Sequence, residues 1–306
     1  MSEPECIGTA ESVVGDKSVK QIKTTRVSSL DREVSTEQLL DTVSVEEPLE
    51  IRVSHKDART TSTATGNTST DSMPQQIAVT MRTPGCDKEL AVGFLFTEGI
   101  ISGESDIADI ILDKRCNGVT VHLREHVVLD PAVFSRHSFV ASSCGICGKK
   151  SIAAVRVKRQ FECLHDQPQI SYGLIHQLPA LQRAQQSEFE RTGGIHASCL
   201  FDVSGNLLAI KEDVGRHNAL DKLLGAELLA GRLPLKDSIL MLSGRASFEL
   251  VQKAAHAGLA VVAAVGAPSS LAVQLAEECD MTLLGFVRDG RFNIYSGSHR
   301  IQLDSV

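Results

Sequence analysis

Two cysteines, Cys144 and Cys147, form a CxxC pair inside the segment SSCGICGKK at 142–150. The run 149–155 is compatible with a helix, and if Cys144 lies near its start, both sulfur atoms share one helical face at i and i+3. Backbone N–H groups, the helix dipole and the lysines at 149 and 150 would then stabilise a thiolate. They would lower the pKa of a cysteine from about 8.5 toward neutrality. Sulfur transfer requires a nucleophile of this kind.

An isolated CxxC is equally typical of half a zinc site and of redox or sulfur chemistry. The second half of a zinc site is missing here, because no other CxxC occurs. The remaining single cysteines Cys116, Cys163, Cys199 and Cys279 are predicted to be small structural thiols among apolar neighbours. In a thioredoxin-type oxidoreductase the CxxC ends the first strand of a short βαβ pattern, whereas here an irregular segment precedes it. That alternative stays open.

A second polar segment, KEDVGRHN at 211–218, lies between a predicted strand and an amphipathic helix. Asp213 is expected to cap that helix. Polar side chains at the carboxyl end of a strand are typical of a ligand site in an α/β sheet, which favours Glu212, Arg216 and His217 as site residues together with Asn218. His217 is equally well interpreted as a core histidine whose hydrogen bonds are satisfied.

Further loops with glycine and serine are GGIH at 193–196, SGRAS at 243–247 and GAPSS at 266–270. Backbone N–H groups at helix starts, with serine hydroxyls such as that of Ser243 and with Arg245, are suited to binding phosphate. Helix capping explains Ser247 and Ser269 equally well. Neither a P-loop nor a GxGxxG fingerprint is present, which argues against an ATPase or a dinucleotide dehydrogenase. The segment FVRDGR at 286–291 predicts a basic turn between two strands, which is also what a surface hairpin with Asp-Gly turn chemistry would show.

Composition limits the remaining function classes. The 306 residues are 42% hydrophobic, and 31 Lys and Arg against 38 Asp and Glu give a formal net charge of -7, which argues against nucleic-acid binding. The absence of Trp and the presence of only two Tyr remove the usual platforms for base stacking. No long apolar run and no signal-like start occur, so we expect a cytoplasmic protein that does not enter a membrane. In that compartment the eight cysteines are expected as thiols or metal ligands rather than as disulfides.

Residues 1–46 are rich in Ser, Thr, Glu and Lys and predict a flexible polar tail. An amino-terminal α+β part is predicted over 47–135, with a disordered Ser/Thr/Gly loop at 58–75. Its expected elements are strands over 48–53 and 77–81, a helix over 88–98, and short strands around Ile110 and over 119–123. A helical stretch over 175–190 follows.

From Ala197 onward strands and helices alternate, which predicts a layered α/β sandwich with a largely parallel sheet over 136–306. The expected strands are 197–202, 207–211, 238–242, 260–265, 282–286 and 292–295, and the expected helices are 216–229, 247–257 and 269–278.

Several long segments in this order resemble the FdhD family of formate dehydrogenase accessory sulfurtransferases. They are TPGCDKELAVGFLFTEGII, SSCGICGK, GGIHAS, EDVGRHNALDKLLG, SGRASFELVQKAAHAG and LAEECDMTLLGFVRDGRFNIY, and the resemblance runs from about Pro48 to the end. It implies a cytidine-deaminase-like layered fold with a smaller amino-terminal α+β part. It does not imply zinc, because none of the ten histidines is followed by x-Glu as in a zinc deaminase.

The resemblance also implies a function. Sulfur would arrive as a persulfide from a cysteine desulfurase and pass to the molybdenum bis(guanine dinucleotide) cofactor, bound as substrate, for formate dehydrogenase. Cys144 matches the persulfide-bearing cysteine and Cys147 the second cysteine, and a homodimer is expected. The matching cofactor-binding residues are Phe286, Val287, Arg288, Asp289, Gly290 and Arg291, joined by the polar residues Arg216, His217, Ser243 and Arg245. Glu212, Arg216 and His217 are candidates to orient the cofactor or move protons. A thiol–disulfide oxidoreductase and a non-catalytic cofactor chaperone remain as alternatives.

Overall fold

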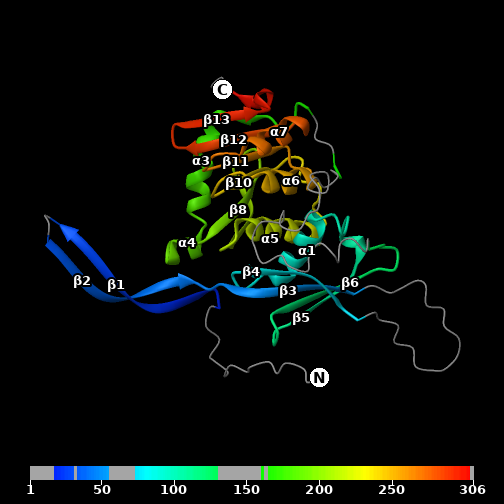
Figure 1. Ribbon diagram of the computed structural model, residues 1–306. Helices are drawn as coiled ribbons and strands as arrows, with labels where there is room; N and C mark the ends of the chain where they lie inside the picture. The colour runs from blue at the N-terminus through cyan, green and yellow to red at the C-terminus, as the bar shows by residue number, and fades with distance from the viewer. Residues whose placement is uncertain (1–16, 31–32, 55–72, 130–159, 162–164, 304–306) are drawn as a thin grey trace.

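A six-stranded mixed sheet forms the centre of the carboxy-terminal half (Figure 1). The structure is a computed structural model and describes residues 17–30, 33–54, 73–129, 160–161 and 165–303. The strand order is β13-β12-β11-β10-β8-β9, in which β10, β11 and β12 run parallel and β8, β9 and β13 run antiparallel to their neighbours. The bounds are β8 His196–Phe201, β9 Leu207–Asp213, β10 Ile239–Leu242, β11 Val261–Ala264, β12 Thr282–Arg288 and β13 Arg291–Ser296.

Helices cover both faces of this sheet. Successive residues of a strand point to opposite sides, so each buried strand contributes side chains to an apolar cluster on either face. Leu240 and Leu242 of β10 belong to the apolar cluster that includes residues of α5 (Arg216–Leu229), α6 (Phe248–His256) and α7 (Ser270–Glu278). Ile239 and Met241 belong to the cluster of α3 (Tyr172–Arg183) on the other face. The result is a three-layer α/β arrangement, which confirms the predicted α/β class. The prediction of a largely parallel sheet is wrong, because three of the five strand pairings are antiparallel and short turns join β8 to β9 and β12 to β13.

A smaller four-stranded sheet, in the order β4-β3-β6-β5, lies beside this body. Helix α1 (Asp87–Thr97) packs against both this sheet and α5. The bounds are β3 Glu47–Ser54, β4 Gln75–Arg82, β5 Ile107–Asp113 and β6 Gly118–Leu123. Shorter elements are the 3-10 turns Glu104–Asp106 and Ser298–Arg300, the helix α4 Ser187–Thr192 and the paired strands β7 Ile170–Ser171 and β14 Ile301–Gln302.

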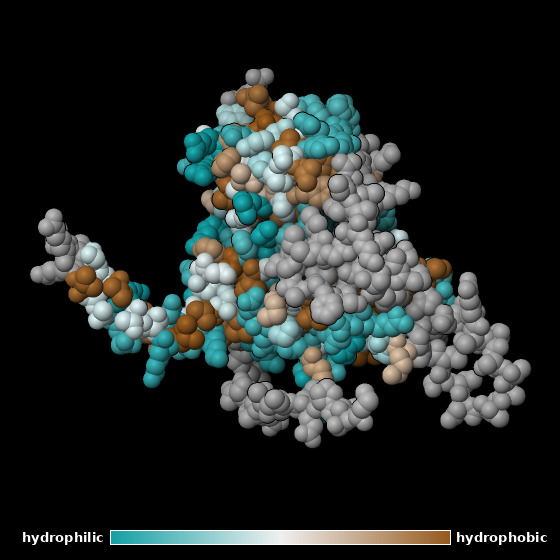
Figure 2. Space-filling view, viewed as in Figure 1, coloured by the Kyte–Doolittle hydropathy of each residue, from teal (hydrophilic) through white to brown (hydrophobic). Residues whose placement is uncertain are grey.

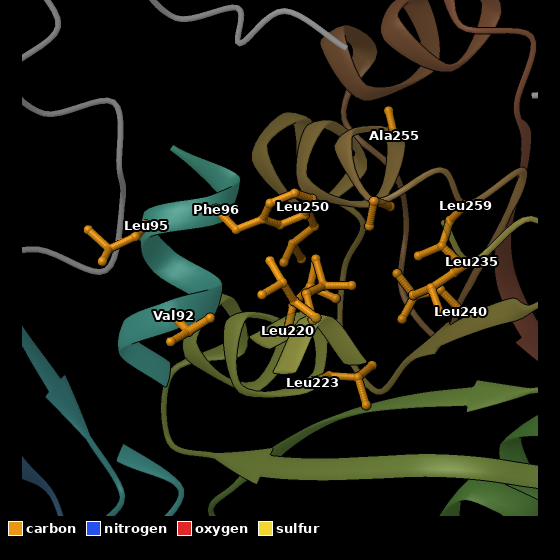
Figure 3. Packing of buried hydrophobic residues seen from close by; sticks show 14 of the residues in the cluster. Val92, Leu95, Phe96, Leu220, Leu223, Leu235, Leu240, Leu250, Ala255 and Leu259 are labelled. Carbon is orange, nitrogen blue, oxygen red and sulfur yellow. The ribbon is translucent and has the colours of Figure 1, made fainter. Parts of the chain in front are cut away.

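Helices α1 and α5 cross with their backbones in contact, at Gly93 and Gly225. A Cβ atom on Gly225 would lie 1.9 Å from the carbonyl oxygen of Glu89, and one on Gly93 would lie 1.9 Å from that of Asp221. Large apolar side chains surround the crossing, among them Val92, Phe96, Leu220 and Leu223 (Figure 3). Through this contact the amino-terminal α+β part and the α/β sheet share one continuous hydrophobic core.

A buried ion pair joins α5 and α6 next to this crossing. Lys253 Nζ lies 2.8 Å from both carboxylate oxygens of Asp221 and 2.8 Å from Oγ1 of Thr97, which in turn donates to Asp221. Burial raises the pKa of Asp221, and the charge of Lys253 opposes that effect. A buried carboxylate is tolerated only with such partners. Helix α1, which carries Thr97, must therefore pack against α5 and α6 in one mutual arrangement.

The tail predicted over 1–46 is wrong for residues 19–44. Strands β1 (Val19–Leu30) and β2 (Glu33–Ser44) pair antiparallel along their whole length and extend away from the body as an arm (Figure 1). Several Thr and Val residues in both strands favour extended backbone, and cross-strand pairs such as Thr25–Gln38 hold a ribbon that needs little apolar burial. Apolar side chains nevertheless stand exposed on it, at Val27, Val34 and Leu40 (Figure 2). Residues 1–16 lie outside the described residues.

Most predicted elements of the second half are confirmed, with α5 at its predicted bounds. In the amino-terminal part, α1 is confirmed with a shift of one residue. The single helix predicted over 175–190 is instead two helices, α3 and α4. The disordered loop predicted at 58–75 ends earlier than expected because Gln75 already belongs to β4, and its residues 58–72 lie outside the described residues. The domain boundary predicted at 135/136 also lies outside them and stays a prediction. None of the described helices has the length and apolarity that a membrane crossing requires.

The glycine crossing predicts the effect of one methyl group. We expect Gly225→Ala to lower the free energy of unfolding by about 1–3 kcal/mol or more, because helix backbone must move to admit the Cβ. Gly103→Ala is the matched control, since Gly103 has extended backbone and its nearest atom to an added Cβ is 3.9 Å away. Urea unfolding measures both, and equal midpoints for the two variants would contradict the close crossing.

Candidate functional site

The predicted polar loops meet at one edge of the six-stranded sheet. The carboxyl ends of the parallel strands β10, β11 and β12 lie there. The loop after β11 contacts the loop after β10 through Gly266 N to Gly244 O at 2.9 Å, and it contacts β12 through Phe286 N to Gly266 O at 3.1 Å. The register pairs His196 with Asp213 and Ser198 with Leu242, so the start of β8 and the end of β9 lie at the same edge. This is where ligands bind in open α/β sheets.

His217 lies in this edge at the start of α5, with only 6% of its surface exposed. Its Nε2 is 2.9 Å from Oε2 of Glu249 and 3.4 Å from Oγ of Ser247. Its Nδ1 has no hydrogen-bond partner among the described residues. His217 is therefore not the fully satisfied core histidine that the sequence left open, because one buried ring nitrogen remains available.

The serine caps that the sequence allowed differ between α6 and α7. Ser269 caps α7 by accepting a hydrogen bond from the backbone N–H of Ala272. Ser247 occupies the same position on α6 but makes no side-chain cap hydrogen bond, and its hydroxyl lies beside His217 instead. Capping therefore accounts for Ser269 and not for Ser247.

Asp213 has a structural role that differs from the predicted cap. The N-cap residue of α5 is Gly215, while the Asp213 carboxylate is fully buried. It accepts hydrogen bonds from Thr83 N at 3.1 Å and Gly215 N at 2.8 Å, and it pairs with Lys222 Nζ at 2.7 Å. Asn218 donates to Asp213 Oδ1 and to the carbonyl oxygen of Met81, so it too holds the fold at this point.

Glu212 points to the other side of β9 and holds the start of α4. Its two carboxylate oxygens accept hydrogen bonds from the backbone N–H groups of Glu188 and Phe189, each at 3.1 Å. This tertiary contact starts a new helix at Ser187 and explains the break between α3 and α4 that the sequence pattern did not indicate.

Residues 286–291 form the hairpin between β12 and β13, as the Asp-Gly turn chemistry of the sequence predicts. Phe286 has a left-handed backbone with φ of 52°, at an irregularity in the strand register, and Val287 is buried. Arg288, Asp289, Gly290 and Arg291 are exposed. Arg288 is the direct cross-strand partner of Arg291, so the two guanidinium groups leave the same face of the hairpin.

The other predicted binding residues occupy the same edge in different environments. Arg216 is half-buried, and its Nε has no partner among the described residues. Arg245 is exposed on the loop after β10. The Ser243 hydroxyl accepts a hydrogen bond from Ala197 N at 2.9 Å, which gives it a structural role beside any contact with ligand.

A pocket of about 510 Å³ opens between α3, α4 and this edge. Its lining includes Gln182, Arg183, Gln186, Phe189, His196 and Ser243. Burial, followed by the nearby charges of Arg216 and His217, lowers the pKa of His196. The α3 and α4 residues of this lining carry no functional signal in the sequence, because their pattern is that of any amphipathic helix.

The cysteines differ in environment. Cys144 and Cys147, the residues predicted to carry the chemistry, lie outside the described residues, as does Cys163. Cys199 is buried as predicted, and burial raises the pKa of its thiol to about 12. Cys279 is half-buried, whereas Cys116 is exposed, so the prediction of a buried thiol is wrong for Cys116.

One group of potential metal ligands occurs among the described residues, at the opposite edge of the sheet. The ligand atoms of His165, Asp280 and His299 lie within 4.8 Å of one another. Arg300, which is buried, already shares the Asp280 carboxylate at 3.2 Å. The group thus ties the carboxy-terminal segment to the start of β12, and it takes no part in the edge described above.

Known proteins resemble the chain over most of its length. Residues 44–302 match the model of the FdhD/NarQ family. The chain is 44% identical over 273 residues to the sulfur carrier protein FdhD of Streptomyces avermitilis, which covers 86% of this chain and 90% of that one. It is 40% identical over 284 residues to the sulfur carrier protein FdhD of Mycobacterium tuberculosis, covering 88% and 96%.

A solved structure has a similar fold. It is a crystal structure from Desulfotalea psychrophila of a protein assigned as a formate dehydrogenase accessory protein. The TM-score is 0.67 at 22% sequence identity, and the match covers 92% of this chain and 99% of that one.

The lowered pKa of His196 predicts how stability depends on pH. Its folded-state pKa lies below the usual 6.5, so as pH falls through that range the unfolded chain takes up a proton that the folded chain refuses. Stability is lost toward acid. We expect His196→Gln to reduce the loss in free energy of unfolding between pH 7.5 and 5.5, by less than about 1 kcal/mol because solvent reaches part of the ring. If the free energies of unfolding of wild type and variant change with pH by the same amount, the lowered pKa of His196 is contradicted.

Proposed function

The chain belongs to the FdhD/NarQ family, and from this membership we propose that it is a sulfur carrier which accepts persulfide sulfur from a cysteine desulfurase. It then delivers the sulfur to the molybdenum bis(guanine dinucleotide) cofactor, as an accessory protein of formate dehydrogenase. The observation that carries this proposal is the family match over 44–302, a range that includes Cys144 and Cys147. The names of the relatives, as sulfur carriers, support it.

The chemical step assigned to Cys144 is nucleophilic displacement. Its thiolate attacks the outer sulfur of the donor's persulfide, a new S–S bond forms at Cys144, and the donor cysteine leaves as a thiolate. The outer sulfur keeps its proton, so Cys144 becomes a persulfide with atoms and charge balanced. Cys147 is proposed as the partner or protecting thiol.

The sheet edge is proposed to receive the cofactor as substrate. Like charges directly opposite each other on a hairpin are destabilising, so Arg288 and Arg291 are best accommodated when an anion such as a phosphate lies between them. Arg216 Nε and His217 Nδ1, both buried without partners among the described residues, offer further polar contacts. Arg245 is exposed on the neighbouring loop.

The remaining expectations belong to the same proposal. We propose a cytoplasmic homodimer, with formate dehydrogenase as the client and with no resident metal. A mixed sheet between two helical layers is compatible with cytidine-deaminase-like layering of the second half.

Sulfur loading tests the proposed mechanism. Incubation of the intact protein with a cysteine desulfurase and cysteine should add one sulfur to its mass, and a reductant should reverse the gain. Cys144→Ala should abolish the gain, because the nucleophile is lost, whereas Cys116→Ala is the matched control for an exposed cysteine.

Wild-type protein that gains no mass would overturn sulfur transfer. A disulfide between Cys144 and Cys147 that reduces generic substrates would instead favour an oxidoreductase. Guanine nucleotide binding that survives in Cys144→Ala, without sulfur loading in wild type, would favour a cofactor chaperone.

The arginine pair predicts opposite effects on stability and on binding. Arg291→Gln should raise the free energy of unfolding by about 0.2–1 kcal/mol by removing a like-charge neighbour. The same change should weaken binding of pyrophosphate by about tenfold, the usual worth of a hydrogen bond to a charged group. Lys236→Gln, an equal change of charge before β10 at the opposite edge, is the control. Unchanged pyrophosphate affinity in Arg291→Gln would remove this arginine from the site.

A further inference from the structure

The group formed by His165, Asp280 and His299 has no part in the proposed function. Its members come from three segments that are distant in sequence. His165 precedes β7, Asp280 connects α7 to β12, and His299 belongs to the 3-10 turn that leads into β14. Two imidazoles and one carboxylate form a donor set that suits zinc and the other late divalent transition metals.

The carboxylate of Asp280 lies between the two imidazoles. Its Oδ2 is 2.8 Å from Nδ1 of His165, and its Oδ1 is 3.7 Å from Nε2 of His299. Ligand atoms bound at about 2.05 Å to a tetrahedral ion are separated by about 3.3 Å, so the two distances from the carboxylate bracket the required value. All three ligand atoms lie within 4.8 Å of one another, and the His165 side chain, which is 69% exposed, has room to turn.

A buried arginine holds Asp280 in position. Arg300 is fully buried, its Nη2 lies 3.2 Å from Oδ2 of Asp280, and its Nε donates to the carbonyl oxygen of Gln167 at 2.9 Å. Carboxylates that bind metals are generally oriented by hydrogen bonds of this kind. Burial alone would raise the pKa of Asp280, but the hydrogen bond from His165 and the charge of Arg300 lower it. Asp280 therefore offers an ionised carboxylate at neutral pH.

Hydrogen bonds occupy the two imidazole nitrogens that face this carboxylate. Nδ1 of His165 donates to Asp280, and Nε2 of His299 donates to the carbonyl oxygen of His165 at 2.6 Å. The two rings stack with their centroids 4.2 Å apart. A cation takes the place of the two protons, and each ring then carries its proton on its other nitrogen. Binding thus replaces two hydrogen bonds with two coordinate bonds.

From these contacts we propose that His165, Asp280 and His299 form a surface site for a divalent transition-metal cation such as Zn²⁺. Three protein ligands leave a fourth position to water. Because His165 is exposed, the cation exchanges with solution, and the site differs from a resident metal centre. The bound cation fastens the turn Ser298–Arg300 to the start of β12 and to the segment before β7. The inference does not depend on sulfur transfer.

Calorimetry with Zn²⁺ tests the site in the untagged full-length protein that carries Cys144→Ala and Cys147→Ala. These two changes are needed because a CxxC pair also binds zinc. This parent should bind one zinc ion at the site. His165→Ala and His299→Gln should each weaken binding by more than tenfold, because loss of an outer partner alone costs about 10–100-fold in metal affinity.

His126→Ala is the matched control and should bind zinc as the parent does. Nε2 of His126 lies 2.8 Å from the Asp106 carboxylate, in a pair that belongs to no group of three ligands among the described residues. Zinc should also raise the urea midpoint of the parent and of His126→Ala, but not that of His165→Ala. A variant that does not fold is recognised by its urea curve, and the other histidine variant then decides.

Cobalt identifies the ligands. Co²⁺ bound by nitrogen and oxygen shows visible d–d bands, whereas thiolate ligands add a charge-transfer band in the near ultraviolet. The parent should show the first without the second, and His165→Ala should show neither. A parent that binds no zinc would overturn the site. Equal zinc affinity in the parent and His165→Ala, or a thiolate band from cobalt in the parent, would do the same.

Discussion

The buried carboxylate of Asp213 is the contact on which the geometry of the sheet edge depends. It receives Thr83 N from the amino-terminal half, Gly215 N from the start of α5 and the ammonium group of Lys222. Removing one partner of such a group leaves an uncompensated charge in the interior, which costs about 3–5 kcal/mol. Because neighbouring strand residues point to opposite faces, fixing Asp213 also fixes Glu212 toward α4. The buried Asp213 carboxylate thus fixes both the start of α5 and, through Glu212, the position of α4 beside the sheet edge.

The sequence was most informative where local pattern and tertiary environment agree. Short apolar runs such as Val261–Ala264 are typical of strands covered on both faces, and α5 begins and ends where its pattern indicates. Topology then brings the polar loops together, because parallel strands have their carboxyl ends at one edge. The placement of Arg216, His217 and Ser243 at that edge was predictable for this reason, whereas their individual contacts were not.

The features that were missed depend on contacts distant in sequence. The break between α3 and α4 is caused by Glu212, more than a helix away along the chain, and no local residue marks it. The arm of β1 and β2 was mistaken for a tail because apolar content predicts core formation and says little about a two-stranded ribbon. Gln186 carries no signal in the sequence either, since only the structure shows that its buried amide nitrogen has no partner among the described residues.

The glycine crossing of α1 and α5 also has a consequence during synthesis. About 120 residues separate Thr97 at the end of α1 from Arg216 at the start of α5. At roughly 5–20 residues per second, a ribosome needs on the order of 6–24 s to make that stretch. Throughout this interval the apolar side chains of α1 that pack on α5 have no native cover. The nascent chain is therefore expected to expose this surface to chaperones, and the amino-terminal half to complete its folding only after α5 has emerged.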